Sequence, residues 1–312
     1  MPLLIVLSVL GLAVLAFAAD HLVLGSGRLA ERLGLEPVVV GVVVIGFGTS
    51  APELVVAGTA GLQGQAELAA SSLVGSNIIN LTLILGIGGL TAALAVRSSV
   101  LRREAPLSVA TVTIFAITLL SGLRLAAGAV LAVALIGAVV VLLRFARATP
   151  RDVVAAETTD YLDTSVRPRL AVEVPRTLAG LVGTLLGAHL LVANASELAV
   201  RAGVSPTLVG FTLVALGTSL PELVTSIQAQ RRGDSDLLVG NLLGSNLVNS
   251  LAGGAIIAFT TTEPPTMAPA VIAAMAGVSG ITWALLARGK RLSRRESVLL
   301  LVLYVALLPL IA

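Results

Sequence analysis

Apolar residues form long uninterrupted runs along most of the chain, and polar residues gather in the segments between them. A helix that crosses the ~30 Å hydrocarbon core of a bilayer needs about 20 mainly apolar residues. Backbone groups in lipid must be satisfied internally, and the alternation typical of barrel strands is absent, so the runs predict an all-α membrane protein. Ten transmembrane helices are expected, at 3–24, 38–61, 67–92, 106–122, 126–145, 175–200, 207–230, 236–260, 267–287 and 296–312.

The basic residues predict how these spans are oriented. With the N-terminus outside the cell, every Lys and Arg except Arg124 and Arg201 lies on the cytoplasmic side. Positive charge is retained on that side of a membrane, so this asymmetry favours ten spans with both termini extracytoplasmic. The predicted location is the cell (inner or plasma) membrane, with multiple passes.

Composition narrows the class of protein further. Of the 312 residues, 56% are hydrophobic and only 12% are charged, against about 25% charged in a typical soluble domain. A net charge of +3 on so apolar a chain excludes a nucleic-acid binder, a disordered chain and a soluble enzyme. The absence of cysteine excludes disulfides, thiolate metal sites and cysteine nucleophiles.

The chain repeats itself at an offset of 169 residues. The segment Gly48–Leu54 returns as Gly217–Leu223 with six of seven residues identical, and Gly75–Asn80 returns as Gly244–Asn249 with four of six identical. Gly34, Pro37 and Gly41 also recur without a gap at Gly203, Pro206 and Gly210.

Five predicted spans lie in each half, and because five is odd, the second half must insert upside down relative to the first. Inverted repeats of this kind are the architecture of secondary transporters. We therefore expect two inverted-topology repeats of five helices, over 1–145 and 175–312, joined by a cytoplasmic linker over 146–174. The repeated motifs lie in helices at about 38–92 and 207–260.

Two glutamates stand out within the spans. Of the 17 acidic residues, only Glu53 and Glu222 lie in the middle of an apolar run. An ionisable group at that depth is costly and marks a functional site by default. Two repeat-related carboxylates with no basic residue nearby create a cation site; the alternative is a protonated pair that holds helices together.

Oxygen-bearing residues surround these glutamates in both halves. Pro52 and Pro221 each lack an N–H and free backbone carbonyls one turn earlier. Ca²⁺ takes six to eight oxygen ligands, and such a set disfavours zinc, copper and iron. The candidate ligands are the hydroxyls of Thr49, Ser50, Thr218 and Ser219 and the amides of Asn80 and Asn249; Asn77 and Asn246 fit ion contact and helix packing equally well.

The paired G-T-S-x-P-E-L and G-S-N-x-x-N segments resemble the two α-repeats of the cation/calcium exchanger superfamily, in its prokaryotic sodium/calcium exchanger branch. The resemblance covers essentially all ten spans. It implies Ca²⁺ binding by Glu53 and Glu222 with oxygens of Thr49 and Thr218. It also implies flanking Na⁺ sites from Ser50, Ser76 and the Gly46 carbonyl in one half, and from Ser219, Ser245 and the Ala215 carbonyl in the other, with Asn80 and Asn249 at the centre.

The resemblance further implies that the two long helices near 3–24 and 175–200 slide against the rest to alternate access. Two positions depart from the family pattern. Asn249 stands where some relatives carry Asp, which removes a charge and weakens the case for potassium coupling. Ser71-Ser72 stands where the second half has Gly240-Asn241.

The expected function is therefore antiport of Na⁺ and Ca²⁺ by alternating access, with net charge movement. The nearest alternative is a proton-driven exchanger of Ca²⁺ or another divalent cation on the same scaffold. An intramembrane hydrolase would need a base beside its nucleophile, yet His21 and His189 lie far along the chain from both glutamates. A passive channel fits the inverted repeat poorly. Besides the transported ions and the bilayer, no cofactor and no obligate protein partner is expected.

Overall fold

The computed structural model describes residues 1–32, 46–91, 93–96, 101–147, 169–231 and 235–310. Gly34, Pro37, Gly41, the start of the span at 38–61 and most of the linker over 146–174 lie outside the described residues. The described part of the first half consists of α1 (Pro2–Arg32), α3 (Gly46–Thr49), α4 (Ala51–Leu62), α5 (Ala66–Ile79), the π-helical segment η2 (Asn80–Ile84), α6 (Leu85–Thr91), strand β1 (Leu94–Ala95), α8 (Glu104–Leu120) and α9 (Leu125–Arg147).

The second half repeats the central part of this order. From α3 to α6, each element returns 169 residues later with the same length, so the repeat seen in the sequence is also a repeat of local structure. The described elements are α11 (Leu170–Ala202), α12 (Pro206–Val209), the π-helical segment η3 (Gly210–Val214), α13 (Ala215–Thr218), α14 (Leu220–Arg231), α15 (Ser235–Val248), the π-helical segment η4 (Asn249–Gly253), α16 (Gly254–Thr260), α17 (Pro269–Gly289), strand β2 (Arg291–Leu292), α18 (Arg294–Leu307) and the 3₁₀ turn η5 (Leu308–Leu310).

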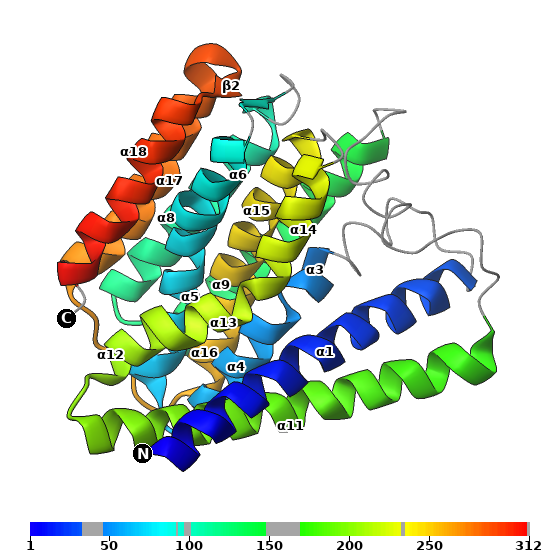
Figure 1. Ribbon diagram of the computed structural model, residues 1–312, viewed down its shortest axis with the longest axis vertical. Coiled ribbons are helices and arrows are strands. Elements are labelled where there is room, and N and C mark those ends of the chain that lie inside the picture. Colours follow the sequence, from blue (N-terminus) through cyan, green and yellow to red (C-terminus); the bar gives the residue numbers. More distant parts are fainter. Residues whose placement is uncertain (33–45, 92, 97–100, 148–168, 232–234, 311–312) are drawn as a thin grey trace.

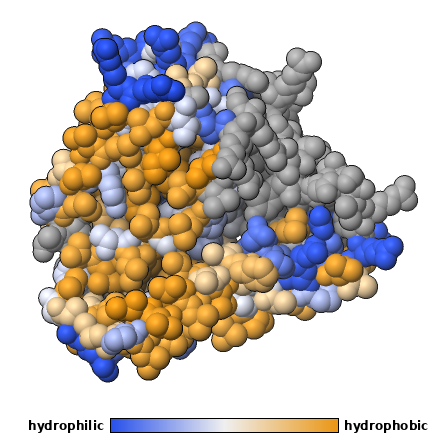
Figure 2. All heavy atoms as spheres, viewed as in Figure 1, coloured by the Kyte–Doolittle hydropathy of each residue, from blue (hydrophilic) through white to orange (hydrophobic). Residues whose placement is uncertain are grey.

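Two helical rods form the centre of the molecule. In the most apolar stretches of Ala66–Thr91 and Leu238–Thr260, 83% of the residues are buried, against 17% in Leu125–Arg144. The outer helices expose many large apolar side chains, among them Leu3, Phe17 and Val133. Figure 2 shows this as a broad hydrophobic band between hydrophilic ends. An apolar surface of this extent fits lipid rather than water.

The halves are packed tightly into one another. A Cβ on Gly75 of α5 would lie 2.8 Å from both the Phe211 carbonyl oxygen of η3 and the Ala215 Cβ of α13. Only glycine allows two helices to approach this closely. A short antiparallel strand pair adds a second link, since Leu94 of β1 pairs with Leu292 of β2.

The long helices α1 and α11 form an antiparallel pair across one side of the bundle (Figure 1). Their axes approach closely at glycines: a Cβ on Gly187 would lie 2.5 Å from the Leu15 backbone nitrogen, and one on Gly180 would lie 2.5 Å from that of Leu22. The glycines at positions 180 and 187 therefore form a contact in which backbone packs on backbone.

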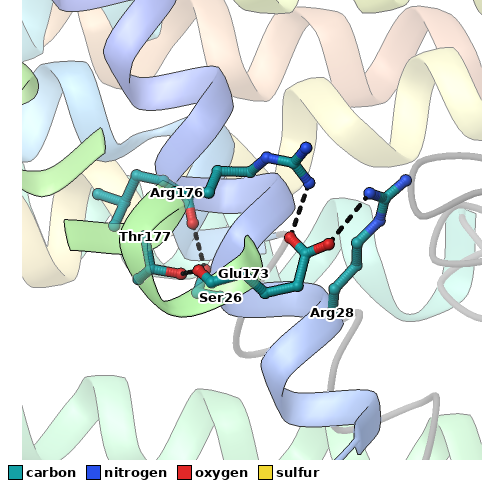
Figure 3. A network of polar contacts seen from close by, with 6 residues as sticks. Ser26, Arg28, Glu173, Arg176 and Thr177 are labelled. Atoms are coloured by element: carbon teal, nitrogen blue, oxygen red, sulfur yellow. Dashed lines mark hydrogen bonds and ion pairs between the residues drawn. The ribbon is translucent and has the colours of Figure 1, made fainter. Parts of the chain in front are cut away.

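A charged cluster joins the same two helices at one end (Figure 3). Glu173 of α11 is 3% exposed, and its carboxylate lies 3.3 Å from Arg28 Nη1 of α1 and 2.7 Å from Arg176 Nη1. The Thr177 hydroxyl donates to the Glu173 carbonyl at 2.7 Å. Because a buried carboxylate is stable only when its charge is compensated, this cluster fixes the register of α1 against α11.

Helical segments occupy every predicted span as far as the structure describes it, with shifted ends. Helix α1 continues to Arg32, and α11 begins at Leu170, ahead of Pro175. Within the described residues, six helices are long and apolar enough to cross a membrane, and a seventh is counted if the bent pair Thr207–Thr218 and Leu220–Ile227 is one span. Because α4, α8 and α18 are shorter, the count of ten stays a prediction.

The close approach of α1 and α11 makes a testable prediction about stability. Gly187→Ala places a methyl group against backbone atoms that cannot move aside, and overpacking of this kind costs about 1–3 kcal/mol. The midpoint of thermal unfolding in detergent should fall. Gly277→Ala on α17 is the matched control, because nothing lies within 4 Å of its added Cβ. An equal loss of stability in both variants would contradict the tight contact.

Candidate cation site

Each half contains a helix break immediately before its glutamate. Helix α3 ends at Thr49 and α4 begins at Ala51, and the break recurs between Thr218 and Leu220. At the break Ser50 has φ −86° and ψ 5°, and Ser219 has φ −84° and ψ 9°. Prolines 52 and 221 cause the interruption, since neither has an N–H for the carbonyl four residues earlier. In the second half the axis bends by 46°.

The break places each glutamate in the first turn of a new helix, Glu53 in α4 and Glu222 in α14. The N-terminal turn of a helix carries partial positive charge, which favours a carboxylate there. Glu53 is 1% exposed and Glu222 is 0% exposed, so both carboxylates lie in the interior.

Serines from the second half contact both carboxylates. The Ser219 hydroxyl donates to Glu53 Oε1 at 3.1 Å, a bond that crosses from one half to the other. The Ser245 hydroxyl donates to Glu222 Oε1 at 3.3 Å. The predicted pairing of the two repeats around one site is therefore seen directly for Glu53 and Ser219.

Several oxygens of the predicted ligand set are buried without a hydrogen-bond partner. Burying a polar atom unbonded is costly, so each such atom calls for an explanation, and a bound ion is one that fits oxygens of the two repeated motifs. Among the described residues, the unpartnered atoms are Glu53 Oε2, Glu222 Oε2, Thr49 Oγ1, Ser50 Oγ, Ser76 Oγ, Asn80 Oδ1 and both side-chain polar atoms of Asn249.

The asparagines of the repeated motifs differ in their hydrogen bonds. Asn246 accepts a hydrogen bond from Asn80 Nδ2 at 3.0 Å and donates to the Asn77 carbonyl at 2.9 Å. Asn77 Nδ2 donates to the Ser250 hydroxyl at 2.9 Å. These bonds link the two central rods, which supports helix packing for Asn246. Asn77 keeps an unpartnered Oδ1, so both interpretations of it remain consistent with the structure.

Asn80 and Asn249 each begin a π-helical segment, η2 and η4. Single turns of π-helix recur at functional sites because they alter the register of the backbone hydrogen bonds. Because the two segments are related by the repeat, one asparagine amide from each half lies beside the helices that carry Glu53 and Glu222. The sequence motif identified both asparagines, but nothing in its pattern indicated the π-helical turns.

Three predicted ligands remain: the carbonyls of Gly46 and Ala215 and the hydroxyl of Thr218. The Ala215 carbonyl accepts the Ser219 N–H at 3.1 Å and the Thr218 hydroxyl at 3.3 Å. Gly46 begins α3, at the start of the first-half motif. Thr218 is 1% exposed, so it is buried beside the break as expected.

Basic groups do not balance the two carboxylates in the described part of the chain. The ion pairs Arg28–Glu173, Arg176–Glu173 and Arg201–Glu197 all lie away from Glu53 and Glu222. The part of the chain that the structure describes also contains no group of three or more His, Cys, Asp or Glu side chains that could hold a metal ion. The site thus combines two charges with neutral oxygens, which suits hard cations such as Ca²⁺ and Na⁺.

The histidines lie away from this site. His189 Nδ1 and Gln63 Nε2 are hydrogen-bonded at 3.0 Å, which links α11 to the end of α4. His21 Nδ1 bonds the Phe17 carbonyl within α1 at 3.0 Å. Both make local contacts, as expected of helix-packing or interfacial residues.

Two polar residues near Glu222 lie outside the predicted ligand set. Thr225 Oγ1 donates to the carbonyls of Pro221 and Glu222 at 3.0 and 3.1 Å. Asn241 Nδ2 donates to Thr225 Oγ1 at 2.9 Å. Alignment of the two repeats could have found them, because Val56 and Ser72 occupy the corresponding positions in the first half.

Comparison with known proteins gives consistent results. A putative antiporter, CaxA of Alkalimonas amylolytica, is 34% identical over 250 residues, which cover 78% of this chain and 76% of the relative. The sodium/calcium exchanger MaX1 of Methanosarcina acetivorans is 24% identical over 336 residues, which cover 96% of this chain and 95% of the relative.

Solved structures of the sodium-calcium exchanger NCX_Mj have the same fold. The form soaked with 2.5 mM Na⁺ and 0.1 mM Ca²⁺ superposes with a TM-score of 0.65 at 27% identity, covering 98% of both chains. The family model described as sodium/calcium exchanger protein matches residues 3–146 and 176–311. The chain therefore belongs to the sodium/calcium exchanger family of membrane proteins.

Proposed function

We propose that this chain is a secondary active antiporter that exchanges Na⁺ for Ca²⁺ by alternating access. The observation that carries the proposal is the pair of buried carboxylates, Glu53 and Glu222, surrounded by neutral oxygens and without a basic partner among the described residues. A charged pair in the interior needs compensation, and a visiting cation supplies it.

Within this proposal, individual residues have distinct roles in binding the two ions. Glu53, Glu222, Thr49 and Thr218 bind Ca²⁺, whose charge matches that of two carboxylates. The Na⁺ sites flank this centre and are lined by Ser50, Ser76, Asn80, Ser219, Ser245, Asn249 and the carbonyls of Gly46 and Ala215. Relatives named for sodium and calcium exchange, and the Na⁺- and Ca²⁺-soaked forms of NCX_Mj, support this assignment.

The proposal includes electrogenic transport. Three Na⁺ in the cavity would leave a net charge of +1, whereas one Ca²⁺ leaves none. Exchange in that ratio responds to the membrane potential at about 2.3 kcal/mol per charge per 100 mV.

The proposal also includes the arrangement in the membrane. Two five-helix units over 1–145 and 175–312, inserted in opposite directions, are joined by the cytoplasmic linker over 146–174, and both termini are extracytoplasmic. The recurrence of α3–α6 as α13–α16 supports two equivalent units, and the distribution of Lys and Arg supports the orientation.

The test is Ca²⁺ uptake into proteoliposomes. Uptake should follow an outward Na⁺ gradient and should change with a clamped potential. If uptake instead followed a pH gradient and ignored Na⁺, the exchanger would be proton-driven on the same scaffold, with Glu53 and Glu222 as the proton carriers.

Neutralising either carboxylate should abolish Ca²⁺ transport. Mutating a residue that hydrogen-bonds to a metal ligand lowers metal affinity about 10–100-fold. Replacing a ligand itself should have a larger effect, so Glu53→Gln or Glu222→Gln should lower Ca²⁺ uptake by more than about 100-fold. Glu197→Gln is the control, because Glu197 pairs with Arg201 on the exposed surface of α11. Retained uptake in a folded Glu53→Gln or Glu222→Gln protein would remove the assigned residue from the site.

Adding a charge at the centre should change how transport depends on pH. Asn249→Asp places a third carboxylate among two that are already unpaired, and like charges in one site favour protonation of one of them. Ca²⁺ uptake by Asn249→Asp should therefore vary with pH in a range where uptake by the unmodified protein is constant. Superimposable pH profiles would show that position 249 does not contact the ions.

A further inference from the structure

Helix α14 differs from its repeat partner α4 along one face. Residues three, four and eight positions after a helical residue share its face. After Glu222 these positions hold Thr225, Ser226 and Gln230. After Glu53 they hold Val56, Ala57 and Gly61, all buried.

The neighbouring helix α15 brings polar groups to the same face of α14. Asn241 Nδ2 donates to Thr225 Oγ1 at 2.9 Å, and Thr225 Oγ1 donates to the Glu222 carbonyl at 3.1 Å. In the first half Ser72 holds the place of Asn241, and its hydroxyl bonds back to the Ala69 carbonyl of its own helix.

Ser226 provides an independent observation. Its side chain is 1% exposed, and its Oγ has no hydrogen-bond partner among the described residues. Helix packing alone favours an alanine at such a position, and Ala57 is the residue found in the first half. A buried, unbonded hydroxyl one turn from Glu222 is available to a ligand that reaches it in another state.

We propose that Thr225, Ser226 and Asn241 line the route by which cations reach Glu222 from the cytoplasmic side. We name these three residues the polar file. The corresponding face of α4, with Val56, Ala57 and Gly61, carries no side-chain oxygen. This inference rests on the proposed function and on the predicted orientation, which places the Arg231 end of α14 in the cytoplasm.

The chemistry of the file fits a cation that sheds its water in steps. Hydroxyl and amide oxygens replace water around an ion. The apolar α4 face offers no such oxygens. Figure 1 shows α4 and α14 toward opposite ends of the bundle, as the two sides of one transport path require.

The file is closed in this conformation. Ser226 and Asn241 are 1% and 8% exposed, and the Asn241–Thr225 hydrogen bond joins α15 to α14 across it. Opening therefore requires this bond to break, so the file is accessible in only part of the transport cycle.

The chain contains no cysteine, so single cysteines can report access without any background. Ser226→Cys and its repeat-matched control Ala57→Cys would each be treated with a membrane-impermeant, positively charged thiol reagent. The reagent is applied to right-side-out and to inside-out vesicles, and modification is read as a mass shift. Labelling Ser226→Cys in the presence of millimolar Ca²⁺ tests whether the cation uses the same route.

We expect Ser226→Cys to react from the cytoplasmic side at least about 10-fold faster than Ala57→Cys, because thiol modification follows accessibility, and Ca²⁺ should slow it. Equal rates for the two variants, no reaction of Ser226→Cys, or its reaction from the outer side alone would overturn the proposal.

Transport gives a second readout with its own matched pair. Thr225→Val, which installs the residue of the first half, should raise the KM for cytoplasmic Ca²⁺ while the KM for external Ca²⁺ stays within about twofold. Equal changes on the two sides would contradict a one-sided route. Val56→Thr, the reverse exchange, should not change the cytoplasmic KM.

The two proposals fail in different ways. Sodium-driven Ca²⁺ uptake by the unmodified protein together with an unreactive Ser226→Cys would reject the route and keep the exchanger. Cytoplasmic labelling of Ser226→Cys that Ca²⁺ slows, without sodium-driven uptake, would keep the route and reject sodium coupling.

Discussion

The need to compensate the charges of Glu53 and Glu222 in the protein interior is the constraint on which the rest of the structure depends. Both carboxylates are buried, and no described ion pair relieves them. Breaking both helices ahead of these residues gives each carboxylate the favourable end of a helix and leaves neighbouring oxygens without partners. This arrangement lowers the stability of the protein without a cation and raises its affinity for one.

Pattern and repeat predicted much of this arrangement from the sequence. The runs of apolar residues located the helices, and the 169-residue offset predicted that α3–α6 would return as α13–α16. The rarity of charge within those runs was enough to single out Glu53 and Glu222. Such inferences are possible because lipid excludes unpaired polar groups so strongly that each one carries information, and the role of the two glutamates stays a prediction.

Other features depend on packing that a single sequence does not encode locally. The π-helical turns at Asn80 and Asn249 lie inside the two central rods, and no residue type in them sets them apart from an ordinary helix. The contact of Gly187 with the Leu15 backbone depends on how α1 and α11 meet, and a glycine within a helix does not by itself indicate its neighbour. Ion-pair partners such as Arg28 and Glu173, separated by 145 residues, likewise appear only once the helices are placed.

The strand pair β1–β2 has a mechanical consequence. Leu94 and Leu292 belong to connections from opposite halves, and their backbone pairing fastens those halves at one edge of the bundle. The Arg294 guanidinium reinforces this edge by donating to the Thr91 carbonyl at 3.3 Å. A body tied along one border deforms most easily at the border farthest from the tie. The α1–α11 pair lies on the border of the bundle away from this tie, and its two helices are joined to each other by close glycine contacts and by the Arg28–Glu173 ion pair.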